Sequence, residues 1–522
     1  MTIAGKDLIA GTWRDIPGDR VTSHNPAHPD QTIWSGSPVH AHVDDAVAVA
    51  RAAFPAWSRF SFAERSNVLR KFQAICKSKV DSLAALIRDE VGKVHWDALA
   101  EAQLLASKVD ITLDASEHAA LRRVSGYEVT LSPSRAGRCW FRPHGVMAVL
   151  GPFNFPMHLP NGHIVPALAM GNTIVFKPSD KAPACGQALA ELYQQALDEA
   201  GAPKGVFNLV QGGADIAGTL ASHADIDGVL FTGSWPVGRR IMQANLNHPG
   251  RILALEMGGN NAAVIMPDAD LKQAVIECVR SAFVTTGQRC TCTRRVIVHK
   301  DVAGRVISAI CKAAGNLSLG HPNESRPVFM GPLISKDARQ RVFDAQHAFH
   351  LNGGDILMSC LPIDFGDEPK VPGWFVTPGV MKVDRFVSEI VDPLLPTSGV
   401  HPGADVEIFG PLLRISVVDS LDDAITQTNA TAFGLAASIF TRDAKAIERF
   451  ATEARAGCIN VNTGTAGASS ALPFGGLGLS GNHRPAGAFS LDYCAYPVAG
   501  MIENGNTAAM PSGMTFDEAW LR

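Results

Sequence analysis

Short apolar segments alternate with helical segments over most of this chain, from Gly145 to about Asn460. The first apolar segments lie at 146–150, 172–176, 206–210 and 228–231, and each ends at small, proline or polar residues. Strands that lack polar alternation and are separated by helices are typical of a parallel sheet with both faces covered. Ligands of such sheets bind beyond the carboxyl ends of the strands. The sequence therefore predicts an α/β fold with a nucleotide-type site at these ends.

Length, charge and cysteine spacing narrow the class of protein. The 522 residues exceed what one hydrophobic core organises, so two or three domains are expected. A formal net charge of −4 gives no general attraction for nucleic acid. No secretory signal and no apolar run of about eighteen residues is present, so no membrane partner is expected. The ten cysteines show no dense disulfide pattern and no paired CxxC spacing, which favours reduced thiols in a cytoplasmic protein and predicts no metal site.

Two glycine-bearing motifs carry the candidate catalytic groups. Cys290 lies in the segment 287–291, about thirty residues after Glu256 in the segment 255–259. Each residue alone carries little weight, because a free cysteine is more often a small buried hydrophobe and a glutamate is usually solvated. Together they permit covalent catalysis, in which a thiolate adds to a carbonyl and a carboxylate later activates water against the thioester. The neighbouring Cys292 is expected to be a packing residue.

The turn at 151–156 holds Asn154 between aromatic and proline residues. A side-chain amide that is held stiffly can donate a hydrogen bond to a developing alkoxide, as in an oxyanion hole. The alternative is a rigid structural turn in which the Asn caps its own backbone.

Two strand ends carry candidate nucleotide contacts. Lys177 and Asp180 can hold ribose hydroxyls, and the carboxylate would repel a 2′-phosphate and so favour NAD over NADP. Gly233, Ser234 and Gly238 lie at a strand-to-helix turn, where the first backbone N–H groups of the helix can bind a pyrophosphate. The alternatives are exposed loop charges for the first pair and a structural tight turn for the second group, which matches neither GxGxxG nor a P-loop.

Seven motifs, taken in order, resemble those of the aldehyde dehydrogenase superfamily along nearly the whole chain. They are Pro-Phe-Asn-Phe-Pro (152–156), Phe-Lys-Pro-Ser (176–179), Phe-Thr-Gly-Ser (231–234), Leu-Glu-Met-Gly-Gly (255–259), Gly-Gln-Arg-Cys-Thr (287–291), Glu-Ile-Phe-Gly-Pro (407–411) and Pro-Phe-Gly-Gly (473–476). The resemblance implies that Cys290 is the nucleophile and Glu256 the general base for hydrolysis. It implies an oxyanion hole made of Asn154 and the Cys290 N–H.

The same resemblance implies where NAD binds. Lys177 and Asp180 would hold the adenosine ribose, and Gly233 to Gly238 would border the pyrophosphate. Glu407 would bind the nicotinamide ribose, with Phe409 near the nicotinamide ring. The departures from the family pattern are Phe153 in place of a frequent Trp, Asp180 in place of a frequent Glu, and Val406 in place of a second acid.

Domain boundaries follow from the pattern and the resemblance together. Residues 1–126 and 144–256 are expected to form a Rossmann-like NAD-binding domain, and 257–460 an α/β catalytic domain. Residues 127–143 and 461–502 are expected to form a small β arm for oligomerisation, which predicts a homodimer or a dimer of dimers. The hairpin at 127–142 is equally compatible with an edge of the first domain. The Pro- and Gly-rich region 350–405 is expected to be a surface loop, and 503–522 a tail.

The segment after residue 465 indicates which class of aldehyde is the substrate. Ser469, Ser470, His483 and Arg484 are hydroxyl and cationic groups near the expected pocket, and Arg binds carboxylates in a bidentate way. The alternative is that His483 and Arg484 make an oligomer contact. These stretches resemble the branch of the family that oxidises N-succinylglutamate 5-semialdehyde in arginine catabolism, which implies an anionic semialdehyde substrate.

The same residues are compatible with other functions. An aldehyde dehydrogenase for a different semialdehyde or an aliphatic aldehyde is one alternative. A cofactor-independent thiol esterase or acyltransferase is another, because Cys290, Glu256 and Asn154 suffice for acyl transfer. A binding module without activity would leave Cys290 unreactive. Glu256 argues against a branch in which coenzyme A, rather than activated water, takes the acyl group.

Overall fold

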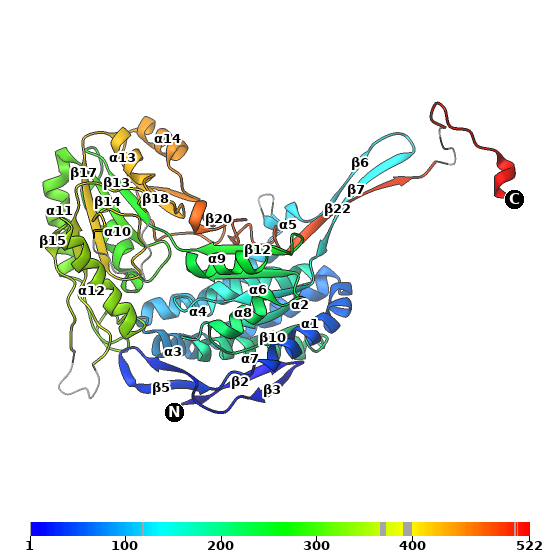
Figure 1. Ribbon diagram of the computed structural model, residues 1–522, viewed down its shortest axis with the longest axis horizontal. Coiled ribbons are helices and arrows are strands. Elements are labelled where there is room, and N and C mark those ends of the chain that lie inside the picture. The colour runs from blue at the N-terminus through cyan, green and yellow to red at the C-terminus, as the bar shows by residue number, and fades with distance from the viewer. Residues whose placement is uncertain (1, 117–118, 366–371, 390–398, 506–507, 509) are drawn as a thin grey trace.

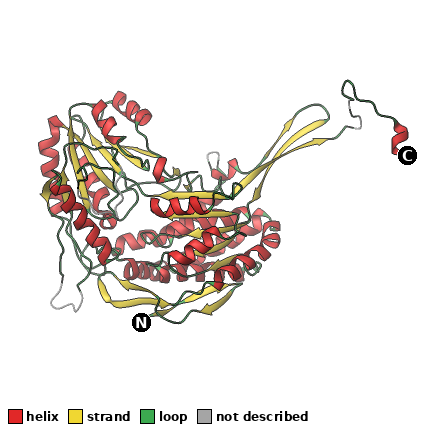
Figure 2. Ribbon diagram, in the orientation of Figure 1, coloured by secondary structure: helices red, strands yellow, loops and turns green. Residues whose placement is uncertain are grey.

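The computed structural model of the protein describes residues 2–116, 119–365, 372–389, 399–505, 508 and 510–522. Two α/β bodies lie side by side, and a β arm projects from the first body, on the side away from the second, toward the C-terminus (Figure 1). Sheets and helices occupy separate layers in each body (Figure 2). The predicted α/β class is confirmed.

The first body contains a seven-stranded sheet in the order β12-β11-β8-β9-β10-β2-β3. Its strands are β12 (Ile252–Met257), β11 (Gly228–Gly233), β8 (Val146–Leu150), β9 (Thr173–Lys177), β10 (Phe207–Leu209), β2 (Lys6–Ile9) and β3 (Thr12–Asp15). The five strands from β12 to β10 are parallel, whereas β2 and β3 are antiparallel additions at one edge. The strand order reverses between β8 and β11, and ligands of open α/β sheets bind at such a point.

Alternating residues of each central strand enter two different cores. Met147 and Val149 of β8 belong to one buried cluster, whereas Val146 and Ala148 belong to another. Successive side chains of a strand point to opposite faces, so both faces of the sheet are covered, as the sequence predicts. The helices of this body are α1 (Ala41–Arg59), α2 (Phe62–Ser78), α3 (Val80–Val91), α4 (His95–Leu113), α5 (Ala120–Arg123), α6 (His158–Met170), α7 (Pro183–Glu199), α8 (Ala214–Ser222) and α9 (Trp235–Ala244).

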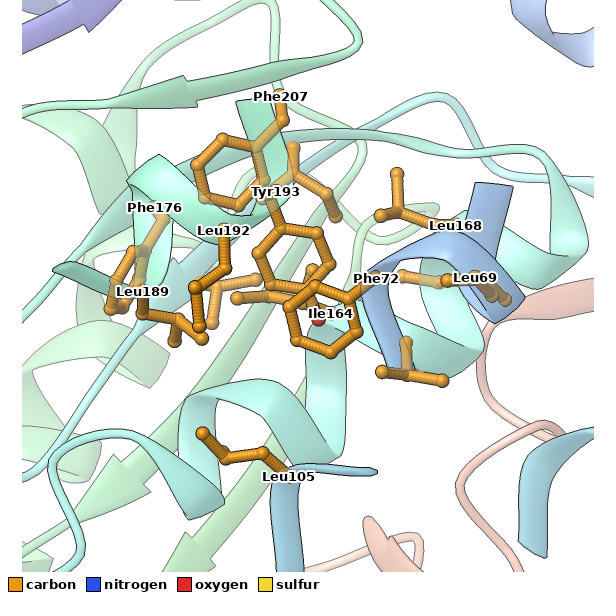
Figure 3. Close-up of a cluster of buried hydrophobic side chains, with 14 of the residues drawn as sticks. Leu69, Phe72, Leu105, Ile164, Leu168, Phe176, Leu189, Leu192, Tyr193 and Phe207 are labelled. Carbon is orange, nitrogen blue, oxygen red and sulfur yellow. The ribbon is translucent and has the colours of Figure 1, made fainter. Parts of the chain in front are cut away.

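The larger of these two cores is aromatic at its centre (Figure 3). The ring of Phe72 on α2 stacks on Tyr193 of α7 at 4.1 Å between centroids, and Tyr193 stacks on Phe207 of β10 at 4.9 Å. Helices α4 and α6 add Leu105 and Ile164. This core fixes α6, which leads directly from the Asn154 turn.

A second seven-stranded sheet forms the other body, in the order β15-β16-β17-β14-β13-β18-β19. Its strands are β15 (Asp355–Met358), β16 (Gly379–Lys382), β17 (Leu412–Val418), β14 (Thr293–His299), β13 (Asn261–Ile265), β18 (Ala436–Phe440) and β19 (Cys458–Val461). The helices are α10 (Leu271–Phe283), α11 (Lys300–Gly315), α12 (Lys336–Leu351), α13 (Leu421–Thr428) and α14 (Ala444–Glu453). All pairings are parallel except that of β15 with β16.

The expected surface loop at 350–405 is wrong for two segments. Residues 355–358 and 379–382 are the strands β15 and β16, and β16 pairs in parallel with β17. The pairing partner, rather than the local composition, decides their conformation, because short strands are stabilised by cross-strand contacts. Residues 366–371 and 390–398 of this region lie outside the described residues.

The arm is a three-stranded antiparallel sheet of β6 (Tyr127–Thr130), β7 (Arg135–Pro143) and β22 (Ala495–Glu503). It extends away from both bodies (Figure 1). The predicted hairpin is therefore present, and the second predicted arm segment, 461–502, joins the arm only from residue 495. The preceding stretch runs back past the first sheet through η2 (Gly478–Ser480) and the short pair β20 (Pro473–Phe474) and β21 (Ala486–Gly487). Gly481 there bridges to Glu256 of β12.

The two ends of the chain add small elements. Strands β1 (Ile3–Ala4), β5 (His28–Gly36) and β4 (Val21–Asn25) form a three-stranded sheet against the first body. The tail carries the short helix η3 (Glu518–Leu521), in which large apolar side chains are exposed. In the part of the chain that the structure describes, no helix is long and apolar enough to cross a membrane.

Replacing Phe72 by Ala should lower the free energy of unfolding of the first body by about 3–5 kcal/mol, because it removes a buried ring from the centre of the core. Urea titration followed by fluorescence measures the change. The control is Leu246→Ala, since Leu246 is 78% exposed and should change stability by less than about 0.5 kcal/mol. Equal effects of the two substitutions would contradict this description of the core.

Candidate active site

Cys290 lies between the two sheets, after the turn η1 (Val284–Gly287) and before β14. Asn261, the first residue of β13, holds the backbone on both sides of it. The Asn261 side-chain amide donates to the carbonyl oxygens of Cys290 at 2.7 Å and Cys292 at 2.9 Å. The residue Cys290 is partly exposed, whereas Cys292 is buried, as the packing assignment predicts. The loop therefore leaves Cys290 more accessible than Cys292.

The turn before Cys290 has an unusual backbone. Thr285 and Thr286 have positive φ values of 54° and 55°, and Gly287 has a φ of 73°. The left-handed region costs a β-branched residue of the order of 1–3 kcal/mol. At Gly287 a Cβ atom would lie 2.2 Å from the Gly410 carbonyl oxygen, so a glycine is needed on both counts.

Asp97 of α4 holds this strained turn in place. Its carboxylate accepts hydrogen bonds from the Thr285 hydroxyl at 2.5 Å and from the Arg289 guanidinium at 2.6 Å. Arg289 also donates to the Thr285 hydroxyl oxygen at 2.7 Å. Burial alone would raise the pKa of Asp97, but the cations Lys93 and Arg289 and these bonds outweigh it, so the pKa lies below its ordinary value.

A buried ion pair supports the Asn154 turn. Lys93 and Glu101 are 2.6 Å apart with almost no exposed side-chain surface. Glu101 also accepts hydrogen bonds from the backbone N–H groups of Met157 and His158, at the start of α6. The Lys93 ammonium lies 3.4 Å from the centre of the Phe155 ring. These contacts hold the Asn154 turn and the start of α6 in place.

Asn154 lies beside the Cys290 loop. Its side-chain amide donates to the carbonyl oxygen of Gln288 at 2.9 Å. The Gln288 side chain in turn accepts a bond from the backbone N–H of Ile334 at 3.0 Å. An amide nitrogen carries two N–H groups, so one donor of Asn154 is not used by this contact.

Glu256 lies at the carboxyl end of β12, directly opposite Thr232 of β11. In the described residues, neither carboxylate oxygen of Glu256 has a hydrogen-bond partner, although both are buried. Burial raises the pKa of Glu256 to about 8, and the Glu407 carboxylate adds to the rise. The Cys290 thiol and the Thr232 hydroxyl are the neighbouring polar groups that lower it in part.

Glu407 approaches the same place from the second body. Its carboxylate accepts a hydrogen bond from the Gly259 N–H at 3.0 Å and lies 3.4 Å from the Arg294 guanidinium. A Cβ atom at Gly258 would lie 1.8 Å from the Glu407 carboxylate, so the glycine permits this approach. Burial raises the pKa of the Cys290 thiol, and the carboxylates of Glu256 and Glu407 raise it further.

The expected ribose contacts, Lys177 and Asp180, lie at and after the end of β9. Lys177 is 6% exposed, and no hydrogen bond to its ammonium is found among the described residues. Burial lowers its pKa to about 8, and the charges of Asp180 and Asp215 oppose that shift. Asp180 is exposed at the edge of a cavity of about 490 Å³ between the two bodies. A nearly buried ammonium without a partner fits a ligand hydroxyl.

The expected pyrophosphate turn lies between β11 and α9. Ser234 is the residue before the helix, and its side chain makes no capping hydrogen bond. A Cβ atom at Gly238 would lie 2.3 Å from the Met257 sulfur, so this glycine lets α9 pack closely on β12. Phe409 packs edge-on to Phe153 with ring centres 5.9 Å apart. The first backbone N–H groups of α9 therefore donate no hydrogen bond to the Ser234 side chain and are available to a ligand.

Residues 13–497 match the aldehyde dehydrogenase family. The chain belongs to the aldehyde dehydrogenase family. It is 39% identical, over 98% of its length and 99% of the relative, to N-succinylglutamate 5-semialdehyde dehydrogenase of Escherichia coli (strain K12). It is 41% identical, over 95% of its length and 97% of the relative, to the protein of that name from Sphingopyxis alaskensis.

Solved structures of the aldehyde dehydrogenase family share this fold. The NAD-dependent aldehyde dehydrogenase from Sinorhizobium meliloti superposes with a TM-score of 0.86 at 27% identity, covering 98% of this chain and 97% of that chain. A 1-pyrroline-5-carboxylate dehydrogenase from Thermus with bound NAD gives 0.83 at 27% identity, covering 95% of this chain and 92% of that chain. The predicted Rossmann-like fold of this protein is therefore confirmed.

The four residues expected to bind substrate fall into two groups. Ser469 and Ser470 lie after a loop that is tied to the Cys290 segment, because the Thr465 hydroxyl donates to the Thr291 carbonyl oxygen at 2.6 Å. Arg484 instead donates to the Gly476 carbonyl oxygen at 2.9 Å, and its neighbour His483 is exposed. Among the described residues, no hydrogen bond joins the two groups.

Several residues that shape this aldehyde dehydrogenase site escape sequence reasoning. Asp97, Thr285 and Asn261 carry no motif of their own in a single sequence. The pair Arg294-Arg295 offers a signal, since two cations at the start of an otherwise apolar strand are expensive unless both are paired. Arg294 is indeed buried and donates to the carbonyl oxygens of Gly259, Gly287, Arg289 and Ile408.

The exchange Asp97→Asn should reduce kcat/KM by about 10²-fold, because it removes the anion that pairs with Arg289 and loosens the turn that places Cys290. It should also lower the free energy of unfolding by about 1–3 kcal/mol. Steady-state kinetics and urea titration measure the two effects. Asp30→Asn, at an exposed position, is the matched control, and an Asp97→Asn enzyme that behaves like it would contradict the positioning role.

Proposed function

We propose that the protein is an NAD-dependent dehydrogenase that converts N-succinyl-L-glutamate 5-semialdehyde to N-succinyl-L-glutamate in arginine catabolism. The observation that carries the proposal is the meeting of Cys290, Glu256 and the Asn154 turn at the junction of the two sheets. Identity of 39–41% to enzymes named for this substrate, over nearly the whole chain, supports the choice of aldehyde.

The residues present fit the cofactor NAD. Lys177 offers a nearly buried ammonium to the adenosine ribose, with Asp180 beside it. Gly233, Ser234 and the start of α9 suit the pyrophosphate, because helix N-termini bind anions. Glu407 would hold the nicotinamide ribose, and Phe409 would pack near the nicotinamide. The chemistry that NAD supplies when bound is acceptance of a hydride.

Cys290 is proposed to attack the aldehyde carbon and form a thiohemiacetal. The free N–H of Asn154 and the backbone N–H of Cys290 stabilise its alkoxide, and one such donor is typically worth about 10²–10³ in rate. Oxidation leaves a thioester on Cys290. Glu256 then takes a proton from water, which attacks the thioester and releases the carboxylic acid together with the thiol.

The β arm is proposed to join copies of the chain into a homodimer or a dimer of dimers. Large apolar side chains are exposed on β6, on the turn that follows it and on β22. They are Tyr127, Val129, Leu131, Tyr496, Met501 and Ile502. Exposed apolar groups gathered on one element mark interaction surfaces. The first body is proposed to bind NAD and the second to carry the catalytic cysteine, as the sequence predicts. The ten free cysteines fit a cytoplasmic enzyme.

Purified protein with NAD and N-succinylglutamate semialdehyde should form NADH, and Cys290→Ala should abolish the reaction, because no other group is placed to form the thioester. Absorbance of NADH measures turnover. Cys292→Ala is the matched control, since that thiol is buried and its hydrogen-bond contact is with the Val284 carbonyl oxygen, away from the reacting groups. Brisk turnover of simple aliphatic aldehydes with none of the semialdehyde would overturn the substrate. Acyl-ester hydrolysis without any nicotinamide binding would instead support the esterase alternative.

Glu256→Gln should leave a burst of about one NADH per active site and then stop, because the thioester forms but water is not activated. Rapid-quench and mass measurements would show the acylated Cys290. In the unchanged enzyme, hydrolysis should rise with pH through about 8, since only the ionised carboxylate is a base and burial raises its pKa to about 8. Full steady-state turnover by Glu256→Gln would remove Glu256 from the mechanism.

A further inference from the structure

A chain of buried hydrogen-bonding side chains lies next to Glu256 and is not used by the mechanism above. Thr232 of β11 is paired with Glu256 of β12 in the sheet register. His163 of α6 lies 3.1 Å from the Thr232 hydroxyl through Nε2 and 2.7 Å from the Tyr493 hydroxyl through Nδ1. Thr232, His163 and Tyr493 are 6%, 2% and 4% exposed. The chain thus runs from the base into the protein interior.

Strand geometry places Thr232 and Glu256 on the same face of the first sheet. Leu230 of β11 and Ala254 of β12 lie in the core on the α6 side, and residues two positions further along each strand point the same way. Neighbouring strands are about 4.8 Å apart, so the two side chains are adjacent. Among the described residues, His163 lies within hydrogen-bond distance of the Thr232 hydroxyl oxygen, and the same hydroxyl lowers the pKa of Glu256, so its O–H can serve the carboxylate.

The direction of the hydrogen bonds among Tyr493, His163 and Thr232 decides whether Glu256 receives a hydrogen bond from the Thr232 hydroxyl. His163 is neutral, because burial lowers its pKa to about 3 and the nearby Lys108 cation lowers it further. A neutral imidazole donates from one nitrogen and accepts at the other. When the Tyr493 O–H donates to Nδ1, the Nε2–H donates to the Thr232 oxygen. The Thr232 O–H can then point to the Glu256 carboxylate beside it, neither oxygen of which has a hydrogen-bond partner in the described residues.

We propose that Tyr493, His163 and Thr232 form an oriented hydrogen-bond chain that stabilises the ionised carboxylate of Glu256 and so sets the pH range in which it activates water. His163 and Tyr493 act through Thr232 and are positioning residues. The proposal rests on the role of Glu256 proposed above. The proton taken from water stays on Glu256 in this step, so the chain supplies a hydrogen bond and no group is transferred along it.

The other groups that face Glu256 explain why one donor matters. Cys290 comes from the loop after η1, Glu407 from the segment before β17, and Cys458 from β19. Glu407 opposes a second negative charge at this place, and burial opposes it further. Thr232 is the neutral hydroxyl donor in this set. On the far side of the chain, Tyr493 is next to Cys494, and burial raises the pKa of both groups, so the tyrosine keeps its proton.

The test is the pH dependence of thioester hydrolysis, measured by rapid quench after the NADH burst in the full-length protein. Thr232→Val removes the donor, and Tyr493→Phe removes the group that orients His163. Each should move the acidic limb of the profile upward by about one to two pH units, the size expected from loss of a hydrogen bond to a charged group. Thr232→Ser should restore the limb. The NADH burst should keep its amplitude in all three.

Tyr193→Phe is the matched control. The Tyr193 hydroxyl is equally buried and donates to Asn161 at 2.6 Å, but it has no connection to Glu256. A merely structural role of Tyr493 would therefore give the same profile in Tyr493→Phe and Tyr193→Phe, and that result would overturn the proposal. Should Thr232→Val fail to fold, the comparison of the two tyrosine variants decides alone.

The two proposals fail in different ways. Unimpaired thioester hydrolysis by Glu256→Gln would remove the base and with it the proposed mechanism. Loss of hydrolysis in Glu256→Gln, together with an unmoved limb in Thr232→Val and Tyr493→Phe, would leave the mechanism intact and overturn only the hydrogen-bond chain.

Discussion

The buried guanidinium of Arg294 is the interaction on which the site depends. It donates to backbone carbonyl oxygens of Gly259, Gly287, Arg289 and Ile408, and it lies beside the Glu407 carboxylate. These carbonyls belong to three segments that are distant in sequence and carry the groups around Glu256, Cys290 and Glu407. A carbonyl buried without a donor costs about 1–3 kcal/mol, so one side chain holds the three segments in register. A lysine offers no such fork of donors.

Two further arginines repeat this design in the second body. Arg295 donates to carbonyl oxygens of Asn260, Gln427 and Thr428, and Arg414 to those of Pro402, Ala404 and Val406. Loops without regular structure lack partners for their backbone groups, and these guanidinium groups provide them. The same framework tolerates the left-handed threonines at 285 and 286, because strain persists where the surroundings determine the conformation.

The sequence predicts best what is local. The apolar strands and the residues that follow them were found, because a parallel sheet places strand ends together without knowledge of any contact. The contact between Asp97 and Arg289 joins residues 192 apart, and no periodicity connects a helix face to a distant loop. Strand β16 has no local signal for the same reason, since its conformation depends on pairing with β17. The composition of 461–494 gives no sign that this stretch passes β12 before the chain enters the arm at residue 495.

The charges of the site impose an order on the proposed reaction. The carboxylates of Glu256 and Glu407 raise the pKa of the Cys290 thiol, and Glu407 also raises the pKa of Glu256. A negative charge on one of these groups therefore disfavours a negative charge on the next. The first step needs charge on sulfur, and the last step needs it on the Glu256 carboxylate. Acylation consumes the thiol and removes one of the competing charges. Glu256 is therefore easier to ionise beside the thioester than beside the thiolate, and the proposed hydrogen bond from Thr232 would act in the same direction at that stage.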